Sequence, residues 1–121
     1  MAKHYDIKGN SGEIIIPLED GIYYTDKMTT RYRRLIVSSF IAYDQDHQPV
    51  SSATGNAEVR VTPNQIQWHK IANSEFSLSD CIVGDVEFEM PSSDSGDFAG
   101  VKLTLSSTGG AAFFSCRLEV L

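Results

Sequence analysis

The sequence predicts an all-β fold: a single-domain antiparallel β-sandwich of about eight short strands, for which a jelly roll is one candidate arrangement. Three observations lead to this class. Apolar and polar side chains alternate in several segments, turn residues recur at intervals of about 8 to 15 residues, and no long segment carries a helical stripe of apolar side chains. A chain of 121 residues is one domain that buries about two thirds of its surface on folding.

The sandwich is predicted to span residues 13–121. Residues 1–12 are expected to form an N-terminal arm that is mobile or docks on a neighbouring molecule. The opening letters, "MAKHYDIKGNSGE", contain no apolar segment of the kind that a secretory signal requires. Short strands are expected at Glu13–Ile16 and Gly21–Tyr24.

The next predicted strand is "RLIVSSFIAY", residues 34–43, which is apolar at both odd and even positions. Its β-branched and aromatic residues favour a strand over a helix. Because both faces are apolar, we expect a central strand that is covered on both sides or that runs through a subunit contact.

Two hairpins are predicted. In "NAEVRVT" the side chains of Ala57, Val59 and Val61 share one face, and Pro63–Asn64 then marks a turn into "QIQWHKI". Further strands are expected at 75–78 and 85–90. At the end of the chain, "VKLTLS" and "FFSCRLEVL" both alternate, and Gly109–Gly110 supplies a turn between them, so these two strands are also predicted to pair as a hairpin. The inward positions predicted for this last pair are Val101, Leu103, Leu105, Phe114, Cys116, Leu118 and Val120.

Cofactors and metals are not predicted. His4, His47 and His69 are not spaced as metal ligands. The loops at 43–56 and 91–100 are rich in Asp and Ser, a composition that suits turns and also, in some proteins, calcium. Turn formation is the favoured interpretation, and calcium binding there stays open.

Charge and cysteine content narrow the function. The chain carries 10 basic and 16 acidic residues, a net charge of −6, which repels phosphate backbones and argues against nucleic acid as a partner. No apolar run is long enough to span a membrane. Cys81 and Cys116 have apolar neighbours and are expected to be buried free thiols, with a disulfide between them as the open alternative.

The basic cluster in "TTRYRRL" is the first candidate for a contact surface. Arginine and aromatic residues are enriched in protein interfaces. We therefore expect a protein-interaction surface formed by Tyr23, Tyr24, Arg31, Tyr32, Arg33 and Arg34.

Aromatic side chains also suit a different ligand. Rings stack on the apolar faces of sugars, so Tyr43 and Trp68 are candidate glycan-binding residues. No serine stands in a G-x-S-x-G context and no other catalytic motif is present, so the chain is not expected to be an enzyme.

The segment from Thr54 to Val120 resembles the small all-β structural virion proteins of tailed bacteriophages, which decorate heads or build fibres and tails. The resemblance comes from "TGNAEVRVTPNQIQWHKI" followed, after an acidic Ser-rich stretch, by "FAGVKLTLSSTGGAAFFSCRLEV" with Arg117 in its last strand. It covers a little over half of the chain. It implies a non-enzymatic protein, made in the bacterial cytoplasm and incorporated into the virion, whose partners are copies of itself and other virion proteins.

The leading functional prediction is therefore a homo-oligomeric structural component of a phage virion that docks on capsid or tail subunits. The alternative is a β-sandwich module that binds glycans or a host receptor.

Overall fold

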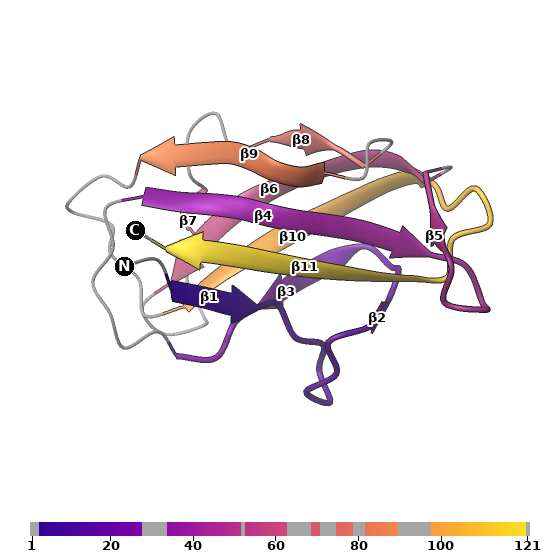
Figure 1. The fold of residues 1–121 in the computed structure, drawn as a ribbon, viewed down its shortest axis with the longest axis horizontal. Coiled ribbons are helices and arrows are strands. Elements are labelled where there is room, and N and C mark those ends of the chain that lie inside the picture. The colour runs from indigo at the N-terminus through magenta and orange to yellow at the C-terminus, as the bar shows by residue number, and fades with distance from the viewer. Residues whose placement is uncertain are drawn as a thin grey trace.

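The computed structural model describes residues 3–27, 34–51, 53–62, 69–70, 75–78, 82–89 and 98–120. Every regular element in these residues is a β-strand, and the strands form two antiparallel sheets (Figure 1). The predicted all-β class and sandwich architecture are confirmed. The described residues contain no helix long and apolar enough to cross a membrane.

The first sheet has the order β1-β11-β4-β5, with β2 beside β11 and β9 beside β4. Its strands are β1 (Lys3–Asp6), β2 (Ile16–Pro17), β4 (Arg34–Tyr43), β5 (Pro49–Val50), β9 (Ile82–Glu89) and β11 (Phe113–Val120). Figure 1 shows this sheet in front, with the long strands β4 and β11 at its centre.

The second sheet lies behind the first and has the order β3-β10-β6-β7, with β8 also paired to β6 (Figure 1). Its strands are β3 (Gly21–Tyr24), β6 (Thr54–Thr62), β7 (His69–Lys70), β8 (Phe76–Ser77) and β10 (Phe98–Ser107). The described residues thus form more strands than the eight expected. Four of these strands, β2, β5, β7 and β8, are only two residues long.

The core lies between the sheets and follows the alternation in the sequence. The predicted inward residues of β6, β10 and β11 are buried, except that Leu105 is partly buried and the side chain of Val120 is not described. At the centre, Phe40 stacks on Phe114 with ring centroids 5.5 Å apart, and Phe76 meets Phe40 edge-on at 5.7 Å. The aromatic rings therefore join the two sheets.

Strand β4 buries residues of both parities because it contains a β-bulge. Its pairing with β11 passes from Val37 to Ser39 while β11 advances by one residue, from Leu118 to Arg117, which leaves Ser38 as an extra residue. Against β9, the partners of Val37 and Ser39 are Val86 and Val83, so two residues of β9 stand unpaired opposite Ser38. Val37 and Phe40 are both buried despite their odd spacing. The bulge thus moves the inward face from odd to even positions partway along the strand.

The predicted hairpin at the end of the chain is wrong. Strand β10 pairs with β6 and β3, whereas β11 pairs with β4 and β1, so the two strands belong to opposite sheets. The connection 108–112, which contains Gly109 and Gly110 at positive φ, crosses from one sheet to the other. The alternation of apolar and polar residues is the same whether the two strands pair in one sheet or lie in opposite sheets, because both arrangements bury every second side chain.

The predicted hairpin upstream is confirmed, since β6 pairs antiparallel with β7 through Arg60–Lys70 and Val61–His69. Its predicted turn at Pro63–Asn64 lies outside the described residues.

The N-terminal arm expected over residues 1–12 is instead part of the sandwich from Lys3 onward. Strand β1 pairs with β11 along its whole length, and Ile7 is fully buried. The Ile7 N–H donates to the Cys116 carbonyl at 2.8 Å, and the Lys8 N–H donates to the Tyr24 carbonyl of the other sheet at 3.1 Å. The strand pairing and one buried isoleucine hold this segment in the sandwich. Its composition is mostly polar, so no apolar pattern in the sequence predicts that it belongs there.

Candidate functional site

A row of rings crosses the outer face of the first sheet at one end. Phe113 of β11 pairs with Tyr43 of β4, Phe113 also pairs with Pro17 of β2, and Tyr43 pairs with Pro49 of β5. Because cross-strand partners share a face, these four residues stand side by side across four strands. We call this set, together with His47, the ring row.

The ring row faces solvent. Phe114 and Ala42, the neighbours of Phe113 and Tyr43 in sequence, are buried in the core, so Phe113 and Tyr43 point outward. Both rings are half-buried, and the prolines at each end are exposed. A half-buried ring on a sheet is held by its neighbours and keeps part of its surface in contact with solvent.

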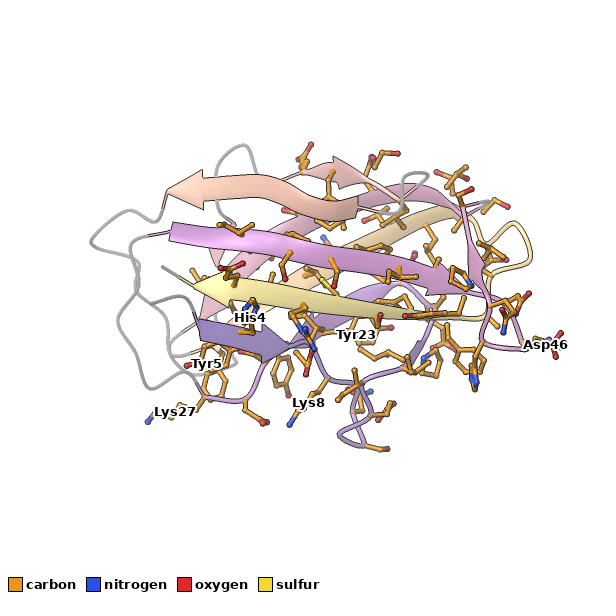
Figure 2. The ribbon with its side chains drawn as sticks, in the orientation of Figure 1. His4, Tyr5, Lys8, Tyr23, Lys27 and Asp46 are labelled. Atoms are coloured by element: carbon orange, nitrogen blue, oxygen red, sulfur yellow. The ribbon has the colours of Figure 1, made fainter. Side chains whose placement is uncertain are left out.

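A tight loop brings His47 to the ring row. Asp44 organises this loop: its Oδ1 accepts hydrogen bonds from the backbone N–H groups of Asp46 at 2.9 Å and Gln48 at 3.0 Å. His47 adopts a φ of 60°, and its ring lies 5.0 Å from that of Phe113, tilted by 59°. Figure 2 shows Asp46 at the far tip of this loop. The Asp44 carboxylate therefore serves the turn, in agreement with the favoured interpretation of the loop at 43–56. Residues 91–97 of the second Asp-rich loop lie outside the described residues.

Polar groups lie beside the rings on the same face. The hydroxyls of Tyr43 and Ser115 are hydrogen-bonded at 3.0 Å, and either can be the donor. Two positions further along β11, Arg117 Nε donates to Asp6 Oδ1 at 3.1 Å. A ligand lying along β11 from the ring row would therefore meet hydroxyl, guanidinium and carboxylate groups.

One thiol lies in the core beneath this face of the sheet. Cys116 is a free, fully buried thiol whose pKa is raised by burial and, to a smaller extent, by the Asp6 carboxylate. It stays protonated and packs as a core residue, which confirms the prediction for this cysteine. In the part of the chain that the structure describes, no three His, Cys, Asp or Glu side chains gather in a way that could hold a metal ion.

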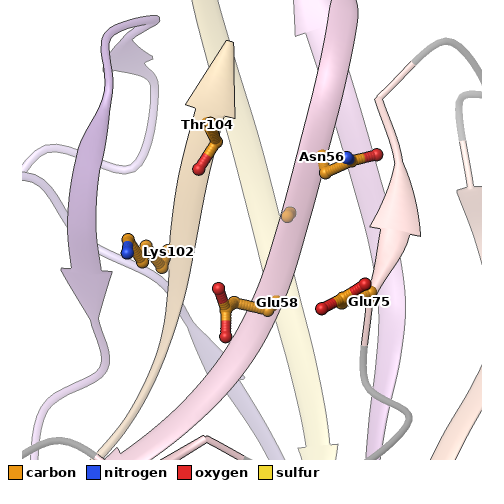
Figure 3. A pocket seen from close by; sticks show the side chains of 6 residues that line it. Asn56, Glu58, Glu75, Lys102 and Thr104 are labelled. Atoms are coloured by element: carbon orange, nitrogen blue, oxygen red, sulfur yellow. The ribbon is translucent and has the colours of Figure 1, made fainter.

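A shallow polar hollow of about 150 Å³ lies on the outer face of the second sheet (Figure 3). Strand β6 contributes Asn56 and Glu58, β10 contributes Lys102 and Thr104, and Glu75 comes from the residue before β8. The buried neighbours Ala57 and Leu103 confirm that these side chains point away from the core.

Of the predicted interface residues, the structure describes the side chains of Tyr23 and Tyr24, which lie on opposite sides of β3. Tyr23 is on the core side of β3, where its ring meets Phe114 edge-on at 5.2 Å and its hydroxyl donates to the Glu19 carbonyl at 2.9 Å. Tyr24 is on the outer side, with its ring 6.3 Å from that of Phe98. Arg34 begins β4, while Arg31, Tyr32 and Arg33 lie outside the described residues.

Of the two predicted glycan-binding residues, Tyr43 lies in the ring row and Trp68 lies outside the described residues, as does Cys81. Sequence reasoning missed Phe113, His47 and both prolines. Phe113 has the same parity as the outward Ser115, which is a usable signal in the sequence. Its position beside Tyr43 depends on the pairing of β11 with β4, two strands far apart in the chain.

No protein-family model and no curated protein matches the chain. Among solved structures, chitosan-binding module 1 of a chitosanase/glucanase from Paenibacillus sp. IK-5 is similar, with a TM-score of 0.49 and 9% identity over 98% of this chain and 92% of that one. A β-porphyranase of glycoside hydrolase family 86 from the human gut bacterium Bacteroides plebeius is also similar, with a TM-score of 0.47 and 16% identity. That match covers 98% of this chain and 20% of the porphyranase. At these levels the likenesses assign no ligand to this chain.

Proposed function

We propose that this chain is a non-catalytic carbohydrate-binding β-sandwich module whose ligand lies on the ring row. The observation that supports this function is the pairing of Phe113 with Tyr43 on the outer face, flanked by Pro17 and Pro49. Aromatic and proline rings offer flat apolar surfaces that match the C–H faces of sugars, while the nearby hydroxyls suit sugar hydroxyl groups.

The shape of the ring row favours a polysaccharide over a single sugar. It crosses four strands, and three strand spacings of about 4.8 Å give a length of about 14 Å. Rings that are already held by the sheet lose little conformational entropy on binding, which favours recognition of an extended chain by a rigid surface.

Affinity gel electrophoresis against a panel of soluble polysaccharides (cellulose derivatives, glycol chitin, xylan, agarose, dextran) tests this function. We expect one of them to retard the wild-type protein. Phe113→Ala and Tyr43→Ala should each weaken that binding by about fivefold or more, because an aromatic anchor contributes over about 1 kcal/mol to an interface.

Tyr43→Phe is the first control: it keeps the ring, removes only the hydroxyl bonded to Ser115, and should retain most of the affinity. Tyr24→Ala, a half-buried tyrosine on the opposite sheet, is the second, and it should bind as the wild type does. Unchanged retardation of Phe113→Ala, with circular dichroism showing an intact fold, would contradict the proposed site.

A second candidate function is the virion subunit suggested by the resemblance in sequence. The observation that favours protein docking is the adjacent pair Ile14 and Ile15, which are 47% and 37% exposed in the loop before β2. Exposed apolar patches mark protein-interaction sites, and these two adjacent isoleucines are the exposed large hydrophobic side chains of the described residues. The two functions are compatible, since a glycan-binding module can form part of a fibre.

A further inference from the structure

We propose that the polar hollow on the second sheet is a second saccharide site, so that the module is bivalent and cross-links polysaccharide chains. This inference rests on the proposed carbohydrate-binding function and adds a site on the opposite face of the molecule. The ring row and the hollow differ in chemistry, one being formed by rings and the other by charged and amide side chains.

Side chains of β6 and β10 and of the residue before β8 line the hollow. Lys102 of β10 pairs directly with Glu58 of β6. On the other side of β6, Ala57 pairs with Phe76, which places the preceding residue, Glu75, next to Glu58. Figure 3 shows the two carboxylates on either side of β6, with Lys102 on the neighbouring strand.

The Glu58 side chain is held in place. Its Oε2 accepts from Nε of Arg60 and lies 3.3 Å from Nη2 of the same guanidinium. Both side chains of this pair are largely covered, at 17% and 22% exposure. A carboxylate that is already oriented needs less ordering when a ligand arrives.

The lining suits a ligand that both donates and accepts hydrogen bonds. Carboxylates accept, the Lys102 ammonium donates, and the Asn56 amide and Thr104 hydroxyl do both. A sugar ring carries several hydroxyl groups, each of which donates and accepts. The opposite charges of lysine and glutamate also disfavour a strongly charged ligand, because the lysine repels a cation and the glutamates repel an anion.

The volume sets the size of what the hollow accepts. At about 150 Å³ it is smaller than the roughly 300 Å³ at which ordinary small-molecule pockets begin. It therefore takes one sugar unit, such as a chain end or a branch. The ring row takes a longer segment.

The two sites face away from each other. The ring row is on the outer face of the first sheet and the hollow on the outer face of the second, with a core about 10 Å thick between the sheets. A single extended polysaccharide cannot lie on both faces without bending around the sandwich. Occupation of both sites therefore joins two chains, or two parts of one chain.

Cross-linking is measured by light scattering when the protein is titrated into the soluble polysaccharide that retards it most in the gel. The wild type should give scattering that rises and then falls as protein exceeds ligand. The double variant Glu75→Gln/Lys102→Met, which leaves the Glu58–Arg60 pair in place, should lose this scattering and keep its gel retardation. Ser106→Ala, further along the same face of β10, is the matched control and should scatter as the wild type does.

Three outcomes overturn the inference in distinguishable ways. If the double variant cross-links as well as the wild type, the hollow is not the second site. If the wild type is retarded in the gel without any scattering, the module is monovalent and the proposed function still stands. If no polysaccharide retards the wild type, the proposed function and the inference both fail.

Discussion

At the scale of single residues, position on a strand decides what each aromatic side chain does. Phe113 and Phe114 are neighbours in sequence, yet Phe114 stacks in the core on Phe40 while Phe113 lies on the outer face. Tyr23 and Tyr24 divide in the same way between core and surface. One step along a strand therefore separates a residue that stabilises the fold from one that is available to a ligand.

Cys116 leads to a prediction about pH. Burial raises the pKa of its thiol above the ordinary value of about 8.5, so the folded protein keeps this proton at a pH where the unfolded chain has lost it. When the folded state binds more protons, stability falls as pH rises. Between about pH 8.5 and about pH 10, we expect this group to lower the free energy of unfolding by up to about 1.4 kcal/mol per pH unit.

Urea unfolding of the wild type and of Cys116→Ala over this pH range measures the effect. The variant should show a shallower loss of stability with pH. Leu118→Ala, on the same face of β11, should be less stable at every pH and keep the wild-type slope. Equal slopes in the wild type and Cys116→Ala would show that the thiol does not control the alkaline limit.

At the scale of the strand, the bulge at Ser38 keeps both halves of β4 in register with the core. Deletion of Ser38 would turn either the Val37 half or the Phe40 half of the strand toward solvent. Since exposing one large buried side chain costs about 2 to 5 kcal/mol, we expect the deletion to unfold the protein or to lower its melting temperature sharply.

Ser38→Ala is the matched variant for thermal unfolding followed by circular dichroism. It keeps the residue count and removes the hydrogen bond that Ser38 Oγ donates to the Arg117 carbonyl at 3.1 Å, a loss of about 0.5 to 1.5 kcal/mol. A deletion variant as stable as Ser38→Ala would mean that the strand adapts to a new register, and the role assigned to the bulge would be wrong.

At the scale of the whole molecule, the two sheets place different chemistry on opposite faces, and the loop carrying Ile14 and Ile15 adds an apolar surface near an edge. On the virion-subunit proposal, this loop contacts another copy or another virion protein. Light scattering should then give a mass that is a multiple of 13.4 kDa, and Ile14→Asp/Ile15→Asp should reduce it to one chain. Asn10→Asp, in the same loop, adds one negative charge where the double variant adds two, removes no isoleucine and should leave the mass unchanged. A monomeric wild type would count against self-association.

The alternation of apolar residues predicted the inward faces of β6, β10 and β11, and the apolar content of residues 34–43 predicted a central strand. These features are local: burial of every second side chain can be read from spacing alone. Its aromatic ring, which suits stacking on a sugar, made Tyr43 a candidate for glycan binding. Reasoning from the sequence predicted this residue but not its neighbour. It could not place Tyr43 beside Phe113, because their contact joins strands that are about seventy residues apart.

The sequence by itself determined the class of the fold, the sides of β6, β10 and β11 that meet the core, and the buried thiol at Cys116. The tertiary structure decided which strands pair, that β10 and β11 belong to opposite sheets, that β1 completes one of them, and that the ring row and the polar hollow lie on opposite faces. The physical reason is that alternation specifies only inside and outside. The choice of partner strand depends on how all the inward side chains fill one shared core.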